Sequence, residues 1–506
     1  MLVNGSRESR RYLWILVPCA VLLCLAAWLR GAEYDEQYTL FLTSGVVRPD
    51  WPATVFPAGL ARELQSGTAS FSEIADDLRV TDVHPPLYFW LVSIWRRVLG
   101  SDLFTARLLS VVLGLGSLTL VGAIARQAQV KPVWAMVLTV GFYGFTYTSV
   151  VARGFALAQL LLLGGVVGLL TGRRCWHFVL AGALFGAATM SNYLAAFAAG
   201  ACLVAVGWNS RPFRLFNVMR GGRTPIHHVI AAVLGFLVFV PADLWWFLAQ
   251  RGSRRDQFPP FSLGRSLARL AARFAGDLLG GLPLYVPGAA SAVVAAALGL
   301  LLLWLIARIV WRWRHIGNPR ARSMFALGAL GPAAGLLALG AIFNNTPIEL
   351  RYLTFSTPFV GLLLAGVLGW RDGGVLLAVQ AASIAGLMLA PQTMQPARAT
   401  AQAAAAWVED GVVLLPRGND GVGVVGAFAI EAPPALPLLL IRPDDTPARI
   451  LARVAPWHRV VLALLDQDAS SHAASEAMRL ALTTQDWREV ARGSNVAVYE
   501  RTGGWE

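Results

Sequence analysis

The sequence predicts a polytopic α-helical membrane protein with about 11 transmembrane helices, followed by a small C-terminal α/β domain. Of its 506 residues, 56% are hydrophobic and 14% are charged, and the mean hydropathy is +0.57. Such a chain is far too apolar for a soluble globular protein of this length. We attribute the net charge of +13 to arginines at membrane boundaries rather than to nucleic-acid binding.

Apolar runs of spanning length recur along the chain as far as residue 391. The first run, Tyr12 to Leu29, follows three arginines and lacks a small-residue cleavage site, so we interpret it as a retained anchor with a cytoplasmic N-terminus. The second run covers residues 106–125. Further spans are expected near residues 132–150, 155–171, 177–191, 193–208, 228–248, 287–307, 323–342, 353–369 and 374–391.

One segment between the first two spans is too short to cross a bilayer. In TDVHPPLYFWLVSIWRR, the apolar part from Pro86 to Trp95 is about 15 Å long as a helix, roughly half the hydrocarbon thickness. It ends on Arg96 and Arg97, which are expected to reach water or headgroups. We therefore predict that residues 86–99 form a helix lying along the membrane interface.

This assignment also satisfies the positive-inside rule, because it makes most basic loops cytoplasmic. These loops lie near residues 126–131, 173–174, 211–223 and 308–322. The loop from residue 251 to 273 is the exception, because its arginines then lie outside. Its pattern RSLARLAARFAGDLL is amphipathic, which favours a helix against the headgroups.

The predicted domain boundary follows the last span. Residues 1–393 form the transmembrane domain, whose first outer loop, residues 31–105, carries the interfacial helices. Residues 394–506 form the α/β domain, which the parity of the spans makes extracytoplasmic. It contains candidate strands at GVVLLP, PLLLIR, RVVLALLD and NVAVYE, with helices expected after Thr400, Thr446 and Ser470. The glycines of GNDGVGVVG stand in the wrong context for a dinucleotide site.

The four cysteines predict no metal or disulfide site. They lie within or beside apolar runs and have no metal-ligand spacing. We therefore interpret them as core thiols.

The unusual polar residues fall on the predicted outer face. Acidic residues begin the first outer loop, an acid and a histidine end it, and arginines stand at the outer ends of spans. They are Asp35, Glu36, Asp82, His84, Arg107, Arg153 and Arg351. Each also has a purely structural interpretation. Acidic residues are common at solvent-exposed helix ends, a histidine before proline often lies in a turn, and arginines at the ends of spans anchor them at the headgroups. Together they suit an enzyme acting on a phosphate-bearing lipid.

The motifs YDEQYTLFLTSG, DVHPPLYFWLV and LGSDLFTARLLSVVLGLGSL occur in an order and at separations that resemble two enzyme families. These are the protein O-mannosyltransferases and the lipid A aminoarabinose transferases, membrane glycosyltransferases of the GT-C fold. The match is best over residues 30–125, moderate around ARGFALAQLLL and ELRYLTFSTPFVGLLLAG, and absent from the C-terminal domain. The sequence departs from the aminoarabinose transferases in having His-Pro where those carry Glu-Lys-Pro, so the resemblance does not imply their donor sugar.

The resemblance implies an inverting transfer from a polyprenyl-phosphate sugar. Asp35 matches the first acid of the family's pair and is expected to act as the base, with Glu36 supporting it. Positively charged groups are needed for the leaving phosphate, and arginine forks can bind it. The substrate-binding candidates are Arg153 and Arg351 for phosphate, Arg107 at the start of the second span, Tyr352 beside Arg351, and Asp82 and His84 on the acceptor side.

The expected location is a bacterial inner membrane, with the active site on its outer face. The expected partners are the lipid-linked donor and a lipid, glycan or protein acceptor, and a divalent cation stays open as the one cofactor. A transporter or flippase of lipid-linked sugars is the main alternative, and a C-terminal sensor domain is a third. The transporter should show inverted repeats and ionisable residues at mid-membrane depth. No repeat is evident, which favours the enzyme.

Overall fold

The computed structural model describes residues 14–208, 210, 224–250, 258–392, 394–418, 420–465, 469–484 and 486–502. The basic segments 1–13, 211–223 and 251–257, on which part of the predicted topology depends, lie outside the described residues. Contacts divide the chain into two compact units. A helical unit comprises residues 1–29, 78–88 and 107–390, and a mixed unit comprises residues 30–77, 89–106 and 391–506. Residues 31–77 and 89–105 of the first outer loop thus group with the C-terminal segment, whereas residues 78–88 belong to the helical unit. The boundary at residue 393 stays a prediction.

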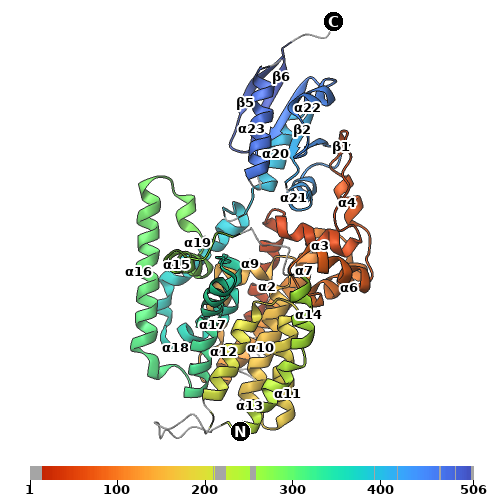
Figure 1. Ribbon diagram of the computed structural model, residues 1–506. Helices are drawn as coiled ribbons and strands as arrows, with labels where there is room; N and C mark the ends of the chain where they lie inside the picture. The colour runs from red at the N-terminus through yellow and green to blue at the C-terminus, as the bar shows by residue number, and fades with distance from the viewer. Residues whose placement is uncertain are drawn as a thin grey trace. The chain divides into compact units, whose positions relative to one another are not determined.

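The mixed unit contains the outer-loop helices and the C-terminal sheet (Figure 1). Its helices are α3 (Tyr34–Ser44), α4 (Leu60–Gln65), α5 (Phe71–Thr81), α6 (Leu87–Leu99), α20 (Ala397–Trp407), α21 (Gly423–Glu431), α22 (Pro447–Val454) and α23 (Ala469–Thr484). Its strands are β1 (Phe56–Pro57), β2 (Gly411–Pro416), β3 (Pro437–Ile441), β4 (Arg459–Ala463), β5 (Trp487–Arg492) and β6 (Val496–Arg501). The chain passes into the other unit within α5 and α6.

The sheet confirms the predicted α/β character of the C-terminal segment. Its strand order is β1-β3-β2-β4-β6-β5, with β2 parallel to β3 and β4, and the other neighbours antiparallel. Every residue of β2 is buried, as expected for a central strand covered on both faces. The alternate side chains of β2, β3 and β4 pack on α22 and α23 on one face, as with Val412, Leu439 and Val460. The sequence analysis missed β1, β5 and α21.

Helix α6 confirms that the short HPP segment is helical, but it corrects the expectation for Arg96. This side chain is only 5% exposed. It donates to the backbone oxygens of Leu40 at 3.0 Å, Gln65 at 2.6 Å and Ser101 at 2.8 Å. Burial lowers the pKa of Arg96 to about 10, so it stays charged at neutral pH. Arg96 therefore joins α6 to α3 and α4 instead of reaching solvent, because it finds carbonyl partners that replace water.

The helical unit holds the apolar runs, and each run predicted to span is helical in its described residues (Figure 1). Its α-helices are α2 (Leu16–Leu29), α7 (Leu103–Gln127), α8 (Pro132–Gly141), α9 (Tyr143–Ser149), α10 (Phe155–Thr171), α11 (Cys175–Thr189), α12 (Ala195–Trp208), α13 (Ile226–Leu237), α14 (Val240–Gln250), α15 (Leu263–Leu279), α16 (Ala289–Trp311), α17 (Pro319–Phe343), α18 (Thr357–Val367) and α19 (Trp370–Leu389). Its 3₁₀ helices are η2 (Leu282–Tyr285), η3 (Trp313–His315) and η4 (Leu350–Ser356).

Among the described residues, six helical stretches are long and apolar enough to cross a membrane, or seven if α2 and α3 are taken together. The six are α7, α13 with α14, α16, α17, η4 with α18, and α19. Helices α8, α10, α11 and α12 are apolar but shorter. The multi-pass membrane character is therefore supported, and the count of about 11 spans stays a prediction.

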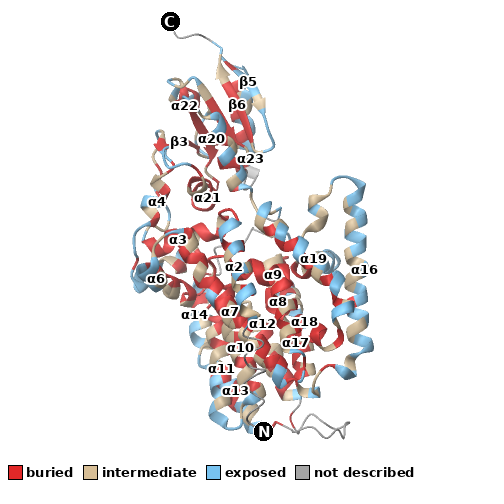
Figure 2. Ribbon diagram, turned by 180° about the vertical axis from the view of Figure 1, so that it is seen from behind, coloured by how far each residue is buried: buried red, intermediate tan, exposed pale blue. Residues whose placement is uncertain are grey.

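Helix α16 shows why the helical unit requires a bilayer. Leu305 is its one buried residue, and apolar side chains such as Val293 and Leu300 are each 68% exposed. Figure 2 shows the length of α16 in the colours of exposed and intermediate residues. An apolar helix left open on nearly all sides would be unfavourable in water, whereas lipid chains solvate it.

Helix α15 forms where the amphipathic pattern predicts a helix, and it carries an acid into the interior of the helical unit. The Asp277 side chain is fully buried, and neither carboxyl oxygen has a hydrogen-bond partner among the residues that the structure describes. It lies against the backbone of Gly144, where a Cβ atom would fall 1.6 Å from Asp277 Oδ1. Burial raises the pKa of Asp277 well above its usual range, because a carboxylate loses its hydration there.

This raised pKa predicts a pH-dependent stability. A carboxyl group whose folded-state pKa exceeds its unfolded-state value stabilises the fold fully at pH values below the unfolded pKa, and the contribution is lost as pH rises through the folded pKa. The melting temperature of the detergent-solubilised protein should therefore fall as pH rises above about 4. In Asp277→Asn this slope should be smaller, as measured by thermal unfolding at a series of pH values. An unchanged slope in the variant would contradict the assignment.

Candidate active site

Helix α3 places the two predicted acids in its first turn. Glu33 is the N-cap, with extended backbone angles of φ −110° and ψ 146°, and its N–H donates to Glu36 Oε2 at 3.1 Å. This is one half of a capping box. Asp35 and Glu36 also face the positive end of the helix dipole, which favours carboxylates. The sequence YDEQYTLF thus begins a helix where its acids are needed to cap it.

Arg30, three residues before the N-cap Glu33, binds this acidic turn. Its side chain has no exposed surface, and its guanidinium contacts Glu33 Oε2 at 2.9 Å and Glu36 Oε2 at 3.0 Å. Glu36 is fully buried, whereas Asp35 keeps 7% of its surface exposed. Glu36 therefore neutralises Arg30 and caps α3, which fits a supporting role for this acid. The sequence analysis missed Arg30, although its spacing of three and six residues from the glutamates could have indicated it.

The C-terminal segment holds the residues just before α3. Arg398 Nε donates to Glu431 Oε2 at 2.7 Å, and Glu431 Oε1 accepts from the N–H of Ala32 at 2.5 Å. Further along α3, Tyr38 Oη donates to Asp420 Oδ2 at 2.5 Å. Within the mixed unit, α20 and α21 therefore form part of the support for the helix that carries Asp35.

A second cluster of predicted residues lies in the helical unit. Asp82 Oδ1 is 2.8 Å from His84 Nδ1, and Arg153 Nη1 donates to Asp82 Oδ2 at 3.1 Å. Asp82 and Arg153 are buried, and the His84 side chain is 15% exposed. The carboxylate therefore orients the imidazole and the guanidinium together. The structure brings these three predicted residues together across 71 positions of sequence.

Neighbouring loops fix this cluster. At Gly154, a Cβ atom would fall 2.5 Å from the Ser191 carbonyl oxygen, so only glycine allows this close approach. Ser191 Oγ in turn donates to the Gly154 oxygen at 2.9 Å. Gln250 Nε2 donates to the backbone oxygen of His84 at 3.0 Å, and Gln250 Oε1 accepts from Tyr193 Oη at 3.0 Å. The sequence analysis missed Gln250 and Tyr193, which stand at breaks in apolar runs.

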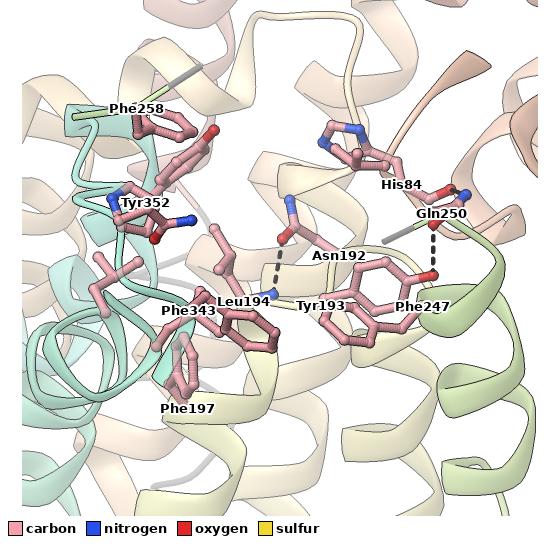
Figure 3. Close-up of a pocket in the computed structure, with 15 residues that line it drawn as sticks. His84, Asn192, Tyr193, Leu194, Phe197, Phe247, Gln250, Phe258, Phe343 and Tyr352 are labelled. Atoms are coloured by element: carbon pink, nitrogen blue, oxygen red, sulfur yellow. Dashed lines mark hydrogen bonds between the residues drawn. The ribbon is translucent and has the colours of Figure 1, made fainter. Parts of the chain in front are cut away.

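A pocket of about 900 Å³ opens beside His84 within the helical unit (Figure 3). Four phenylalanines line it, together with leucines from α17: they are Phe197, Phe247, Phe258, Phe343, Leu336 and Leu339. Its polar lining comes from His84, Asn192, Tyr193, Gln250, Asn345 and Tyr352. Figure 3 shows the tyrosines and His84 on the same cavity as the phenylalanines. The pocket is therefore suited to a ligand with a long apolar part and a polar head.

The remaining predicted arginines are placed differently. Arg107 is buried, and its Nη1 donates to the Ala27 oxygen at 2.8 Å, near the C-terminal end of α2, where a cation is favourable. Arg351 is half-buried in η4 and lies over the Tyr352 ring at 5.7 Å. Tyr352 lines the pocket, and Arg351 is its chain neighbour. Arg107 thus contacts backbone, and Arg351 stands beside the pocket.

The apolar helices, the amphipathic helices of the outer loop and the C-terminal sheet define a multi-pass membrane protein of the predicted class. No protein-family model matches the chain, and no curated protein matches it. Among solved structures, the chain is similar to ArnT from Cupriavidus metallidurans in the apo state, at 12% identity and a TM-score of 0.50, over 97% of this chain and 98% of that chain. This likeness confirms the GT-C fold predicted from the sequence.

Two further structures match over most of the chain. ArnT from the same organism bound to undecaprenyl phosphate matches at 13% identity and a TM-score of 0.49, over 96% of this chain and 97% of that one. The apo oligosaccharyltransferase of Archaeoglobus fulgidus matches at 11% identity and a TM-score of 0.45, over 97% of this chain and 74% of that one.

The buried charge of Arg30 generates a stability prediction. Arg30→Met should lower the free energy of unfolding by about 3–5 kcal/mol, because it leaves two buried glutamates without their cation. Arg48→Met, at an exposed arginine of the same unit, is the matched control and should cost little. Thermal unfolding in detergent measures both. Equal melting temperatures for the two variants would show that the Arg30 ion pairs are unimportant for the fold.

Proposed function

We propose that the protein is an inverting glycosyltransferase that transfers a sugar from a polyprenyl-phosphate donor to an acceptor. The reaction would take place on the outer face of a bacterial inner membrane, with residues 394–506 extracytoplasmic. The pocket beside His84 carries the proposal, and the ArnT-like fold supports it. The positive-inside argument supports the orientation.

The pocket matches the two chemical parts of such a donor. Phenylalanine and leucine side chains provide an apolar surface for isoprenoid units, whose burial is favourable in proportion to their area. Amide and phenol groups of Asn192, Gln250 and Tyr352 can meet a polar headgroup. ArnT has been crystallised with undecaprenyl phosphate, a ligand of this chemistry.

We assign Asp35 as the general base. The acceptor hydroxyl would attack the anomeric carbon from the side opposite the lipid phosphate, its proton would pass to the Asp35 carboxylate, and the polyprenyl phosphate would leave with the bonding electrons. One such displacement inverts the anomeric configuration. Glu36 supports Asp35, because its contacts with Arg30 and the Glu33 N–H fix the first turn of α3.

We assign the leaving phosphate to Arg153 and Arg351. Arg153 is oriented by Asp82, and Arg351 stands beside the pocket-lining Tyr352. A guanidinium fork stabilises the negative charge that develops on the leaving phosphate. Asp82 and His84 would line the acceptor side, and Arg107 would hold the end of α2.

The base assignment predicts the effect of replacing one carboxylate oxygen of Asp35 by an amide nitrogen. Asp35→Asn should lower turnover about a hundredfold or more, because an amide cannot accept the acceptor's proton. Radiolabelled polyprenyl-phosphate sugars incubated with purified protein give the readout, through donor consumption. Asp50→Asn, at an exposed aspartate of the same unit, should retain parental turnover. Near-normal turnover in Asp35→Asn would assign the role of base to another acid. If the protein instead transferred each donor lipid from one leaflet of a vesicle to the other without consuming it, a transporter would be favoured.

The phosphate assignment predicts that lysine cannot replace arginine. Arg351→Lys keeps the charge but loses the bidentate fork, so the apparent KM for donor should rise about 10- to 100-fold, the equivalent of one charge-assisted hydrogen bond. Arg153→Lys should also raise the apparent KM for donor. Arg314→Lys, at an exposed arginine of η3, is the control and should match the parent. A parental KM in both test variants would identify them as membrane anchors.

A further inference from the structure

Three potential metal ligands meet at one end of the helical unit, and none of them is among the residues that line the pocket. Cys175 begins α11, and His227 and His228 lie in the first turn of α13. The Sγ atom and one nitrogen of each imidazole all lie within 4.8 Å of one another. This is the one such group of three among the residues that the structure describes. Ligand spacing along the chain could not reveal it, because 52 residues separate the cysteine from the histidines.

Helix packing enforces this convergence. Helices α11 and α13 run side by side in the same direction, since Phe178 stacks on His228, Gly182 faces Ala232 and Gly186 faces Phe239, just beyond α13, in turn along both segments. A Cβ atom at Gly182 would fall 1.9 Å from the Ala232 oxygen, and one at Gly235 would fall 2.1 Å from the Val179 oxygen. Two glycines therefore allow the backbones to touch, as small residues do between membrane helices. Parallel helices in such contact bring their N-terminal turns, and thus the three ligands, together.

Aromatic stacking fixes the orientation of the rings around the group. His228 stacks on Phe178, with centroids 4.3 Å apart and planes 7° apart, and His227 lies edge-on to His228 at 4.4 Å. His177 is engaged otherwise: its ring stacks on Trp176 at 3.8 Å, and its Nδ1 accepts from the Arg174 N–H at 3.3 Å. Cys175 and His227 are exposed, so an ion can reach them from solvent.

We propose that Cys175, His227 and His228 bind a zinc ion. One thiolate and two imidazoles form a donor set that Zn²⁺ prefers, and a water molecule would complete the tetrahedron. Binding releases the thiol proton, and the resulting thiolate offsets one of the two positive charges of the ion. The bound ion joins the first turns of α11 and α13. By the predicted topology, this end of the helices is cytoplasmic, on the side opposite the proposed reaction.

Metal stoichiometry tests the proposal without any activity assay. Detergent-purified protein carrying no polyhistidine tag, equilibrated with Zn²⁺ and desalted, should retain about one zinc per chain by elemental analysis. Cys175→Ser and His227→Asn should each lose it. Cys24→Ser, at a partly exposed thiol of α2, and His315→Asn, at an exposed histidine of η3, should retain it. Zinc retained equally by the parent and by both site variants would overturn the proposal.

Cobalt provides an independent spectroscopic readout. Co²⁺ in the parent should give a thiolate-to-metal charge-transfer band, which Cys175→Ser should abolish and Cys24→Ser should preserve. Zinc should also raise the melting temperature of the parent but not that of His227→Asn, because a ligand that binds only the folded state stabilises it. A cobalt band that survives in Cys175→Ser would place the ion elsewhere and overturn the assignment.

Discussion

The burial of Arg30 between two glutamates is the constraint on which the acidic turn of α3 depends. A guanidinium without exposed surface is costly unless carboxylates pair with it, and Glu33 and Glu36 both do so. The same two glutamates form the N-terminal cap of α3. The start of the helix therefore cannot shift by one residue without leaving a buried charge unpaired. Asp35, between them in sequence, is held in the first turn as a consequence.

The C-terminal segment extends this constraint through the mixed unit. Glycines of α21 admit side chains of α3: a Cβ atom at Gly423 would fall 2.1 Å from the Tyr34 ring, and one at Gly426 would fall 2.8 Å from Gln37 Oε1. The Glu431 carboxylate at the end of α21 accepts from Ala32 and Arg398. The sequence resemblance is absent from this segment, yet its contacts support the helix that carries the proposed base. A role in positioning Asp35 follows for α20 and α21.

Local patterns in the sequence predicted many of the elements, but not β1, β5 or α21, and only the fold shows the long-range contacts. The apolar runs predicted to span from their length are helical in the described residues. The Thr446 cap indicated α22, and short apolar runs indicated the buried strands. The sequence also indicated the Asp82, His84 and Arg153 candidates, although their mutual contacts needed the fold. It could not show that Arg96 is buried, because its carbonyl partners lie up to 56 residues away. The same limit concealed Gln250 and the Cys175 group, whose partners are also distant in sequence.

The central claim is that the pocket beside His84 holds a polyprenyl phosphate, and photocrosslinking tests it most directly. A diazirine-bearing polyprenyl phosphate should label pocket-lining residues of α12, α14 and α17, including Phe197, Phe247 and Phe343. Excess undecaprenyl phosphate should suppress that label. Labelling confined to lipid-exposed residues such as Val293 of α16, without competition by undecaprenyl phosphate, would contradict the account.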